Sequence, residues 1–258
     1  MISIILVLLS SSALASQSDR SKGPIIVLYA NEWAPISEGN GKQVRGILPG
    51  LIEEIIQKRL GIDVIHKGVP WGRAQEEIER GTADAFVTTP TPTRKKYAIP
   101  SDQNVLYVPF EAFVRKGSSA ENSLKSGRPL TALKNTGFCD LLGNGWAVEF
   151  YRARKIDYQI APTIDSCLNM LSRGRTDIVI HATPVTQLFI KKLGFTNEIV
   201  RISHVYSESP KFPLLISKKS KFGADFLERF DQTLADMKKT SEYDDLLQEL
   251  TTQYLEHF

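Results

Sequence analysis

Length, composition and charge set the first limits on what this chain is. With 258 residues, 42% of them hydrophobic, the sequence is long enough for one large domain or for two of about 110–130 residues, each with a real core. Its 32 basic and 29 acidic residues leave a formal charge of only +3 and are spread along the chain, which excludes the basic stripe of a nucleic-acid-binding or membrane-surface protein. We therefore expect a soluble globular protein with no nucleic-acid partner.

The N-terminus has the pattern of a secretory signal peptide. A short apolar run at 2–9 is followed by serines and by Ala13-Leu14-Ala15, a small-x-small cleavage sequence, although no Lys or Arg precedes the run. A membrane anchor needs roughly 20 apolar residues, and no cysteine for lipid attachment lies near the cleavage site. We predict that residues 1–15 are a signal peptide and that the mature protein is exported, free, to the periplasm.

The first half of the mature chain alternates short apolar strands with amphipathic helices. Apolar residues recur at helical spacing from Ile47 to Leu60, and Gly61 ends that helix. We expect strands at 25–29 and 62–66 and a further strand from residue 85, with helices at 47–60 and from 70 to 80. Strand, helix, strand, helix, strand is the order of half of an open parallel sheet.

The second half repeats this order. We expect strands at 111–115, 130–133, 158–161 and 177–181, helices at 145–154, 166–173 and 184–193, and a loop at 117–127. A strand at 212–216, a long helix through 222–237 and a last helix at 243–254 then complete the chain.

One short pattern occurs in both halves. Residues 78–87 end a helix, continue through Arg80-Gly81 to Asp84, and enter an apolar strand, and residues 171–180 do the same through Arg173-Gly174 and Asp177. The glycine suits a left-handed helix cap, so each copy is a helix that leads into a buried strand. Two such copies predict two similar α/β lobes with a cleft between them.

Several short motifs together resemble a known family. They are Gly46-Ile-Leu-Pro-Gly50, Trp71, Gly81-Thr-Ala-Asp84, Thr91-Pro-Thr-Arg94, Ser101-Asp102 and Gly174-Arg-Thr-Asp177. In this order and spacing they resemble the type II periplasmic solute-binding proteins, and among them the family 3 branch that serves polar amino-acid ABC importers. The resemblance extends from about residue 25 to residue 254.

The resemblance implies a fold and a function. The fold is α/β, of the periplasmic-binding-protein type II, with two α/β lobes joined by a two-strand hinge and a ligand cleft between them. Lobe 1 would comprise 24–110 plus 207–258, and lobe 2 would comprise 111–206. The function implied is capture of a small, carboxylated ligand by a monomer that needs no cofactor and delivers the ligand to an ABC permease in the inner membrane.

Ligand-binding residues are expected just past the strand that begins at Ala85. In open α/β sheets, ligands bind at the carboxyl ends of the strands, where Thr88, Thr89, Thr91 and Arg94 follow. In the family, the Arg of a Thr-x-x-Arg motif binds the ligand carboxylate, and Arg94 occupies that position. A guanidinium offers two parallel donors to a carboxylate. The alternative is that Arg94 caps a helix or pairs with a surface acid.

Two tryptophans are candidates for a second wall of the site. Trp33 follows the first strand, where the family often places an aromatic residue over the ligand, and Trp71 opens a helix on the same side of the sheet. The alternative for each is a residue of the lobe core. Arg73 would add charge to the cleft or lie on the helix surface.

The second copy of the pattern departs from the amino-acid binders. Those proteins carry an acid five residues after the repeated Asp, which accepts the α-ammonium group of the ligand, and here that position is Ala182. Burying an ammonium without a counter-charge costs several kcal/mol, so the ligand is expected to lack an amine unless another acid replaces the missing one. The candidate replacements are Glu32, Asp140 and Glu208.

His181 and Thr183 flank Ala182 and are candidate ligand contacts. A neutral His181 would hydrogen-bond a ligand, and a protonated one would add a positive charge. The alternative is a histidine satisfied within the lobe. The four histidines, at 66, 181, 204 and 257, show no metal-ligand spacing with each other or with the cysteines, so we predict no metal site.

Cys139 and Cys167 suit an oxidising compartment. Paired, they would close a loop that stabilises the fold by roughly 3.5 kcal/mol on the chain-entropy model. The alternative is two buried free thiols.

Two other function classes remain open on this fold. Some relatives are enzymes, for example cyclohexadienyl dehydratases, which would need a general acid or base, and His181 is the only candidate. No nucleophile or phosphate-loop motif occurs, so we expect no enzyme activity. The third class is a ligand sensor that acts on a membrane partner in trans.

Overall fold

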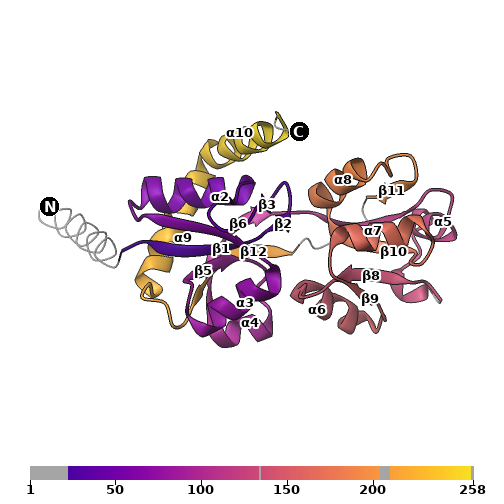
Figure 1. Ribbon diagram of the computed structural model, residues 1–258, viewed down its shortest axis with the longest axis horizontal. Helices are drawn as coiled ribbons and strands as arrows, with labels where there is room; N and C mark the ends of the chain where they lie inside the picture. Colours follow the sequence, from indigo (N-terminus) through magenta and orange to yellow (C-terminus); the bar gives the residue numbers. More distant parts are fainter. Residues whose placement is uncertain (1–22, 134, 204–209, 257–258) are drawn as a thin grey trace, which may run out of the picture. The chain divides into compact units, whose positions relative to one another are not determined.

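The computed structural model describes residues 23–133, 135–203 and 210–256 (Figure 1). The predicted signal peptide and Glu208, His204 and His257 lie outside these ranges. The chain forms two compact units: unit 1 runs to Leu106 and resumes at Phe212, and unit 2 is Tyr107–Lys211. The chain passes between them at the end of β6 (Ala98–Tyr107) and at the start of β12 (Lys211–Ser217).

Unit 1 contains a five-stranded sheet in the order β4-β1-β5-β12-β6. β1 (Ile25–Ala30) pairs in parallel with β4 (Val64–Val69) and with β5 (Ala85–Val87), while β12 is antiparallel to β5. The strands predicted near 25, 62, 85 and 212 are confirmed. The strand β6 was not predicted, because its sequence AIPSDQNVLY mixes polar and apolar residues without strict alternation. A small hairpin of β2 (Glu32–Trp33) and β3 (Ser37–Glu38) follows β1.

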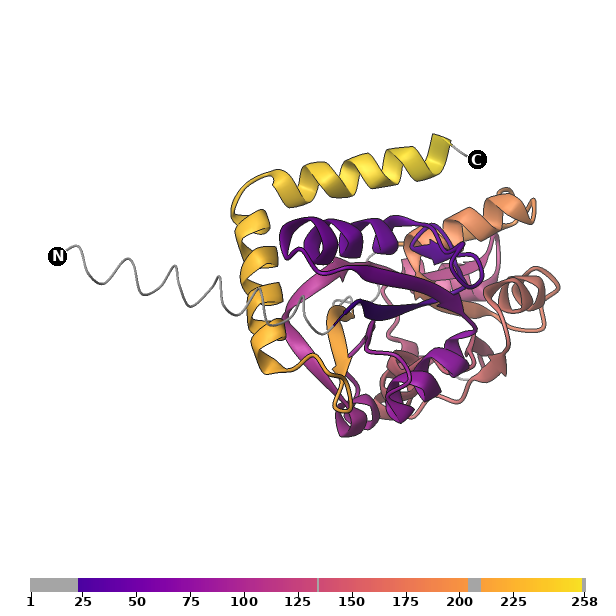
Figure 2. The same cartoon turned by 60° about the vertical axis from the view of Figure 1, so that its left-hand side comes forward.

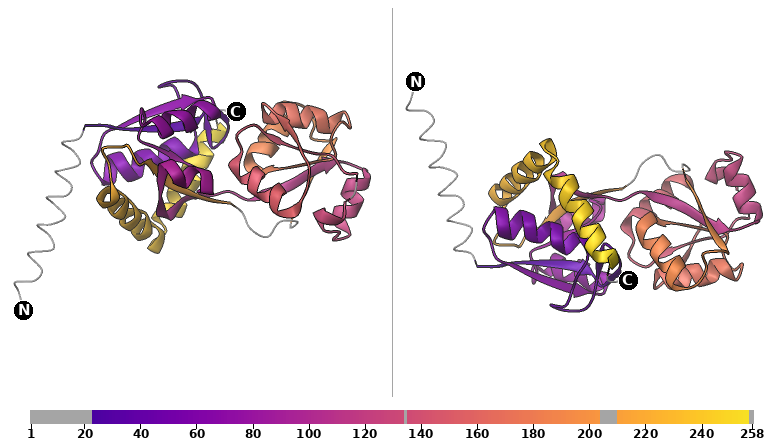
Figure 3. Two further views of the ribbon diagram at one scale, coloured as in Figure 1. Left: turned by 90° about the horizontal axis from the view of Figure 1, so that it is seen from below. Right: turned by 90° about the horizontal axis from the view of Figure 1, so that it is seen from above.

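Helices cover both faces of the unit 1 sheet (Figures 1 and 2). One face carries α2 (Ile47–Ile52), which continues as the π-helix η1 (Glu53–Arg59), and α10 (Glu242–Glu256) packs on α2 (Figure 3). The other face carries α3 (Trp71–Arg80) and α4 (Pro92–Tyr97). The helix α9 (Ala224–Lys239) buries Phe226 and Phe230 and lies against η1 and α10. The predicted helices of this unit are confirmed, but α4 was not expected.

Unit 2 contains a second five-stranded sheet, in the order β11-β7-β10-β8-β9. The central strand β10 (Ile178–Ala182) is parallel to β8 (Phe138–Leu141) and antiparallel to β7 (Phe110–Arg115). The edges are β9 (Gln159–Ala161) and β11 (Ile199–Ile202). The predictions near 111, 158 and 177 are confirmed, whereas β8 and β11, four residues each, were not predicted.

The helices of unit 2 correct two predictions. The segment expected to be a loop at 117–127 contains α5 (Ser119–Lys125), because the Ser118 hydroxyl accepts the Glu121 amide and caps the helix. The strand expected at 130–133 is wrong, because Leu130–Ala132 forms a 3₁₀ turn that buries Leu130.

Three predicted helices of unit 2 are confirmed. They are α6 (Gly145–Arg154), α7 (Ile164–Ser172) and α8 (Thr183–Lys192).

Strand alternation divides the core of unit 2 between the two faces of its sheet. Ile178 and Ile180 pack with residues of α5 and α6, whereas Val179 packs with residues of α7 and α8. The second cluster holds Cys139 of β8 and Cys167 of α7, which the structure joins in a disulfide with a Cα separation of 5.7 Å. The free-thiol alternative does not describe this structure.

The repeated pattern forms the same local structure in both units. Gly81 and Gly174 are left-handed, with φ of 79° and 69°. The amide of the next residue then reaches back to a carbonyl five residues earlier, from Thr82 to Glu77 at 3.0 Å and from Arg175 to Met170 at 2.8 Å. This is the Schellman helix end, which needs a residue that tolerates positive φ.

The aspartate of the pattern ties its strand to the parallel neighbour. Asp84 Oδ2 accepts the amide of Ile26 in β1 at 2.9 Å, and Asp177 Oδ2 accepts the amide of Gly137, just before β8, at 2.8 Å. Asp84 also accepts the Ser220 hydroxyl at 2.6 Å. The repeated residues therefore build the scaffold, and the side chains that differ between the copies lie at the other ends of the strands.

Candidate functional site

The residues that follow β5 form a compact turn in unit 1. Thr88 and Thr89 leave the strand buried, and Pro92 opens the short helix α4. The Thr91 hydroxyl caps this helix by accepting the Arg94 amide at 3.3 Å. The cap sets the position of Arg94 at the carboxyl end of the central strand.

The Arg94 guanidinium is buried, with 3% of the residue exposed, and the two threonines hold it. Nη1 donates to the Thr88 hydroxyl at 2.9 Å, to the Thr89 hydroxyl at 2.6 Å and to the Thr89 carbonyl at 3.0 Å. The alternative of a surface ion pair does not fit a side chain this deeply buried. The predicted residues Thr88, Thr89, Thr91 and Arg94 thus lie together in the structure.

The helix α3 supplies two further contacts to the guanidinium. Gln75 Oε1 accepts from Nε at 3.2 Å and from Nη2 at 3.1 Å, and the ring of Trp71 lies 5.3 Å from Cζ. The prediction placed Trp71 near the site but missed Gln75. Its position four residues after Trp71, on the same helix face, was the available signal.

Burial disfavours the charged form of Arg94. It lowers the pKa of the guanidinium to about 10, although the interaction with Tyr97 raises that pKa. The side chain therefore remains a cation at neutral pH. The oxygens of Thr88, Thr89 and Gln75 that accept from the guanidinium are uncharged. A buried guanidinium at a strand end is a group that can bind an anion.

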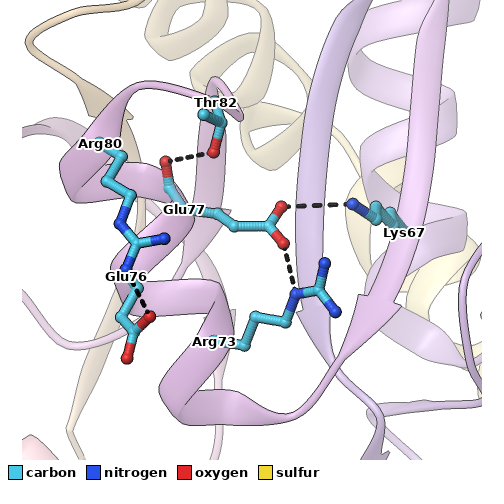
Figure 4. Close-up of polar contacts among 6 residues, drawn as sticks. All are labelled: Lys67, Arg73, Glu76, Glu77, Arg80 and Thr82. Atoms are coloured by element: carbon cyan, nitrogen blue, oxygen red, sulfur yellow. Dashed lines mark hydrogen bonds and ion pairs between the residues drawn. The ribbon is translucent and has the colours of Figure 1, made fainter.

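Arg73 of α3 points toward Glu77 of the same helix and Lys67 of β4 (Figure 4). Its Nε contacts Glu77 Oε1 at 2.6 Å, and Lys67 Nζ contacts the other oxygen at 3.3 Å. Burial tends to raise the pKa of Glu77, but the hydrogen bonds from Arg73 and Lys67 outweigh it and lower that pKa. With 63% of its side chain exposed, Arg73 has the helix-surface role that was one of its two predicted roles.

Trp33 is half-buried in β2 and packs on Phe212 of β12, with ring centroids 5.4 Å apart. The start of β12 lies at the same sheet edge as the end of β5, because Thr88 N donates to Pro213 O at 3.3 Å. The aromatic pair therefore belongs to the edge of the sheet that carries Arg94.

In unit 2, His181 is the penultimate residue of β10 and is 5% exposed. Neither ring nitrogen has a hydrogen-bond partner among the described residues, and the ring of Phe110 lies 5.4 Å from the imidazole. Burial lowers the pKa of His181 to about 4, so the imidazole is neutral at neutral pH. Of its two predicted states, this environment favours the neutral one.

Thr183 is 4% exposed and contacts an acid that the sequence analysis missed. Its hydroxyl donates to Glu111 Oε2 at 2.7 Å, and Arg201 Nη1 contacts the same oxygen at 3.2 Å. Glu111 lies directly opposite His181 in the antiparallel pair of β10 and β7. Only this strand pairing brings residue 111 beside residues 181 and 183.

The candidate replacements for the acid missing at Ala182 lie in different environments. Glu32 is exposed in β2. Asp140 is 1% exposed at the end of β8, and burial raises its pKa to about 7 against hydrogen bonds from Leu141 and Asn144. Ala182 itself is fully buried.

Within the described ranges, no group of three or more His, Cys, Asp and Glu side chains is arranged to hold a metal ion. None of the described helices has both the length and the apolar character to cross a membrane.

Solved structures with this fold include binding proteins and sensor domains. A mutant of ArgBP from T. maritima is 21% identical, with a TM-score of 0.69, and the match covers 92% of this chain and 99% of that one. An amino acid ABC transporter substrate-binding protein from Streptococcus pneumoniae, bound to L-arginine, is 17% identical, with 92% and 98% covered and a TM-score of 0.69. The periplasmic VFT2 domain of Bordetella pertussis BvgS is 16% identical, with 92% and 97% covered and a TM-score of 0.74.

These likenesses confirm the predicted fold class, the two-lobed type II periplasmic-binding-protein fold. No curated protein matches the sequence. The profile of one family, however, matches nearly all of the described chain, from residue 25 to residue 253. The chain belongs to the bacterial extracellular solute-binding proteins, family 3.

Proposed function

We propose that this chain is an exported protein that binds a small carboxylated ligand through Arg94 and delivers it to an ABC-type permease. The observation that carries the proposal is the buried Arg94 cation at the carboxyl end of β5. A carboxylate would meet a guanidinium whose position is already fixed by Thr88, Thr89 and Gln75. Little side-chain entropy is then lost on binding, and the charge-assisted bonds form where water is scarce.

The surroundings of β10 support a ligand that is not a standard amino acid. The position expected to hold an acid for an ammonium group is the buried Ala182. Glu111 contacts Thr183 and Arg201, and a ligand ammonium would have to compete with that arginine. Burying an ammonium without its own counter-charge costs several kcal/mol.

Binding without turnover is part of the proposal. An enzyme on this fold would need His181 as its acid or base, and burial lowers the pKa of His181 to about 4. A group with that pKa is a weak base and is almost fully deprotonated at neutral pH, so it is poorly matched to proton transfer. Conversion of prephenate or a related acid by the wild-type protein, lost in His181→Ala, would favour the enzyme instead.

A sensor that acts on a membrane partner in trans is the second candidate. It is favoured by the likeness to the BvgS VFT2 domain and to a histidine kinase sensor domain with similarity to periplasmic binding proteins. Ligand-dependent uptake into vesicles that contain a permease supports delivery. Ligand binding without uptake, together with a ligand-dependent change in a membrane kinase, supports sensing.

The first experiment is a thermal-shift screen of simple carboxylates, amino acids, sugars and peptides. At 100 times its Kd, a true ligand adds about 2.7 kcal/mol of stability. Calorimetry then compares the wild type with Arg94→Ala and Arg94→Lys, with the exposed Arg73→Ala as the matched control. We expect Arg94→Ala to abolish binding, Arg94→Lys to weaken it and Arg73→Ala to leave it unchanged. Equal affinity of the wild type and Arg94→Ala would contradict the carboxylate assignment.

A further inference from the structure

One edge of the buried Arg94 guanidinium is occupied by an amide oxygen of the same unit. Gln75 Oε1 accepts from Nε at 3.2 Å and from Nη2 at 3.1 Å. A carboxylate binds a guanidinium edge through the same kind of contact, with hydrogen bonds from two parallel N–H groups. Gln75 therefore uses the two donors that a carboxylate would use at this edge.

Other acceptors occupy the rest of the guanidinium. Nη1 donates to the hydroxyls of Thr88 and Thr89 at 2.9 Å and 2.6 Å, and Tyr97 adds a side-chain hydrogen bond. Only 3% of Arg94 is exposed. A ligand carboxylate must therefore take the place of one of these acceptors when it binds Arg94 directly.

Gln75 is the acceptor that can leave at the lowest cost. Thr88 and Thr89 are buried and follow β5 directly, and Tyr97 packs against the hydrophobic core of unit 1. Gln75, by contrast, is half-buried on α3, so its side chain can turn toward water. Its contacts with Arg94 are also longer than those of the two threonine hydroxyls.

We infer that Gln75 occupies the carboxylate-binding edge of Arg94 and gives it up to the ligand. The carboxylate then takes the donors Nε and Nη2, while Thr88 and Thr89 keep Nη1 in place. The exchange replaces an uncharged acceptor by a charged one, which makes the hydrogen bonds roughly twice as strong. An uncharged ligand gains nothing from the same exchange, so Gln75 selects for anions. This inference rests on the proposed binding of a carboxylate by Arg94.

The test titrates acetate and acetamide, two probes of the same shape of which only acetate is charged. NMR follows the Nε–H signal of Arg94, which is identified by its loss in Arg94→Lys, and gives a Kd for each probe. Gln75→Met removes the amide oxygen and keeps the length of the side chain, whereas Gln75→Glu places a carboxylate at the same edge. The matched control is Arg73→Gln, which makes the same change of charge at an exposed position of α3.

We expect acetate to bind Gln75→Met roughly 10-fold more tightly than the wild type, because no acceptor has to be displaced. Gln75→Asn, whose amide is too short to reach Arg94, should have the same effect. Gln75→Glu should weaken acetate binding roughly 10-fold or more at neutral pH, because a fixed carboxylate competes for the same donors. Arg73→Gln should leave the Kd unchanged, and acetamide should bind the wild type roughly 10-fold or more weakly than acetate.

Two failures are distinguishable. If acetate binds the wild type, Gln75→Met and Gln75→Glu with one Kd, or binds Gln75→Met more weakly than the wild type, the inference is wrong and the proposed function is unaffected. If acetate leaves the Arg94 signal unchanged in the wild type and in every Gln75 variant, the proposed function is wrong as well.

Discussion

The two units share one strand arrangement and differ at the strand ends. Both sheets place the repeated strand, β5 or β10, between a parallel and an antiparallel neighbour. In both, a left-handed glycine ends the preceding helix and an aspartate accepts an amide from the parallel neighbour. After β5, unit 1 buries a guanidinium at Arg94, whereas at the end of β10 unit 2 buries the imidazole of His181 next to Ala182.

This difference separates the residues that hold the fold from those that could contact a ligand. The repeated Gly ends a helix and the repeated Asp accepts a backbone amide, so the same two residue types have the same structural role in both units. The side chains at the strand ends differ: Arg94 contacts Thr88, Thr89 and Gln75, whereas the ring of His181 lies 5.4 Å from that of Phe110. The predictions below test whether the scaffold positions behave alike and whether the strand ends behave differently.

The largest difference in stability should come from the disulfide, because the chain has only two cysteines and both lie in unit 2. Replacing Cys139 and Cys167 together by Ala should destabilise unit 2 by about 3.5 kcal/mol on the chain-entropy model. Hydrogen exchange of the amides of β10 and β5 measures the two units separately. An equal loss of protection in both strands would show that the units unfold as one.

The two aspartates of the repeated pattern should not be equally important. Asp84 is 8% exposed and accepts two hydrogen bonds, whereas Asp177 is half-buried and accepts one from Gly137. At about 1.5 kcal/mol for each charge-assisted bond, Asp84→Ala should cost about 3 kcal/mol and Asp177→Ala about half of that. Urea unfolding of each variant gives the two values, and a larger cost for Asp177→Ala would contradict the bonding shown here.

Unit 2 should carry two pH dependences of opposite sign. Burial lowers the pKa of His181 from 6.5 to about 4, so the folded state binds fewer protons than the unfolded chain in this range, and stability is lost as the pH falls through it. Burial raises the pKa of Asp140 from 3.8 to about 7, so the folded state binds more protons, and stability is lost as the pH rises through that range.

Single substitutions should expose each dependence. Between pH 4 and 7, His181→Phe should lose roughly 2–3 kcal/mol of stability as the pH rises, whereas Asp140→Asn should gain a similar amount. The wild type should lie between them. Trp146 fluorescence reports urea unfolding of unit 2 when Trp33 and Trp71 are replaced by Phe. If the stability of both variants changed in the same direction with pH, the opposite pH dependences assigned to His181 and Asp140 would be wrong.

The smallest effect should come from the helix-capping glycines. An Ala at either position would have to adopt the same positive φ, which destabilises the folded state by about 1–2 kcal/mol. At Gly81 the new Cβ would also lie 2.6 Å from Cβ of Lys219, whereas at Gly174 it would meet the mobile end of Arg115 at 3.2 Å. Thermal unfolding should therefore rank Gly81→Ala below Gly174→Ala in stability, and the reverse order would argue against this packing.

The elements that the sequence predicted well are those with a strong local pattern. Residues 145–154 have a polar cap at Asn144 and form α6 as expected, and β10 begins with the apolar run Ile178-Val179-Ile180. The elements missed lack such a pattern. The helix α4, with the sequence PTRKKY, has no apolar face, and β8 is only four residues long and includes Asp140.

For the candidate site, the sequence by itself determined the family and the cluster of Thr88, Thr89, Thr91 and Arg94, because these residues are neighbours in the chain. It also determined that Ala182 stands where an acid is expected. Only the tertiary structure decided that Gln75 holds Arg94 and that Glu111 lies beside His181 and pairs with Arg201. Those contacts join residues from different helices and strands, and burial, which sets the charge of Arg94 and His181, depends on everything packed around them.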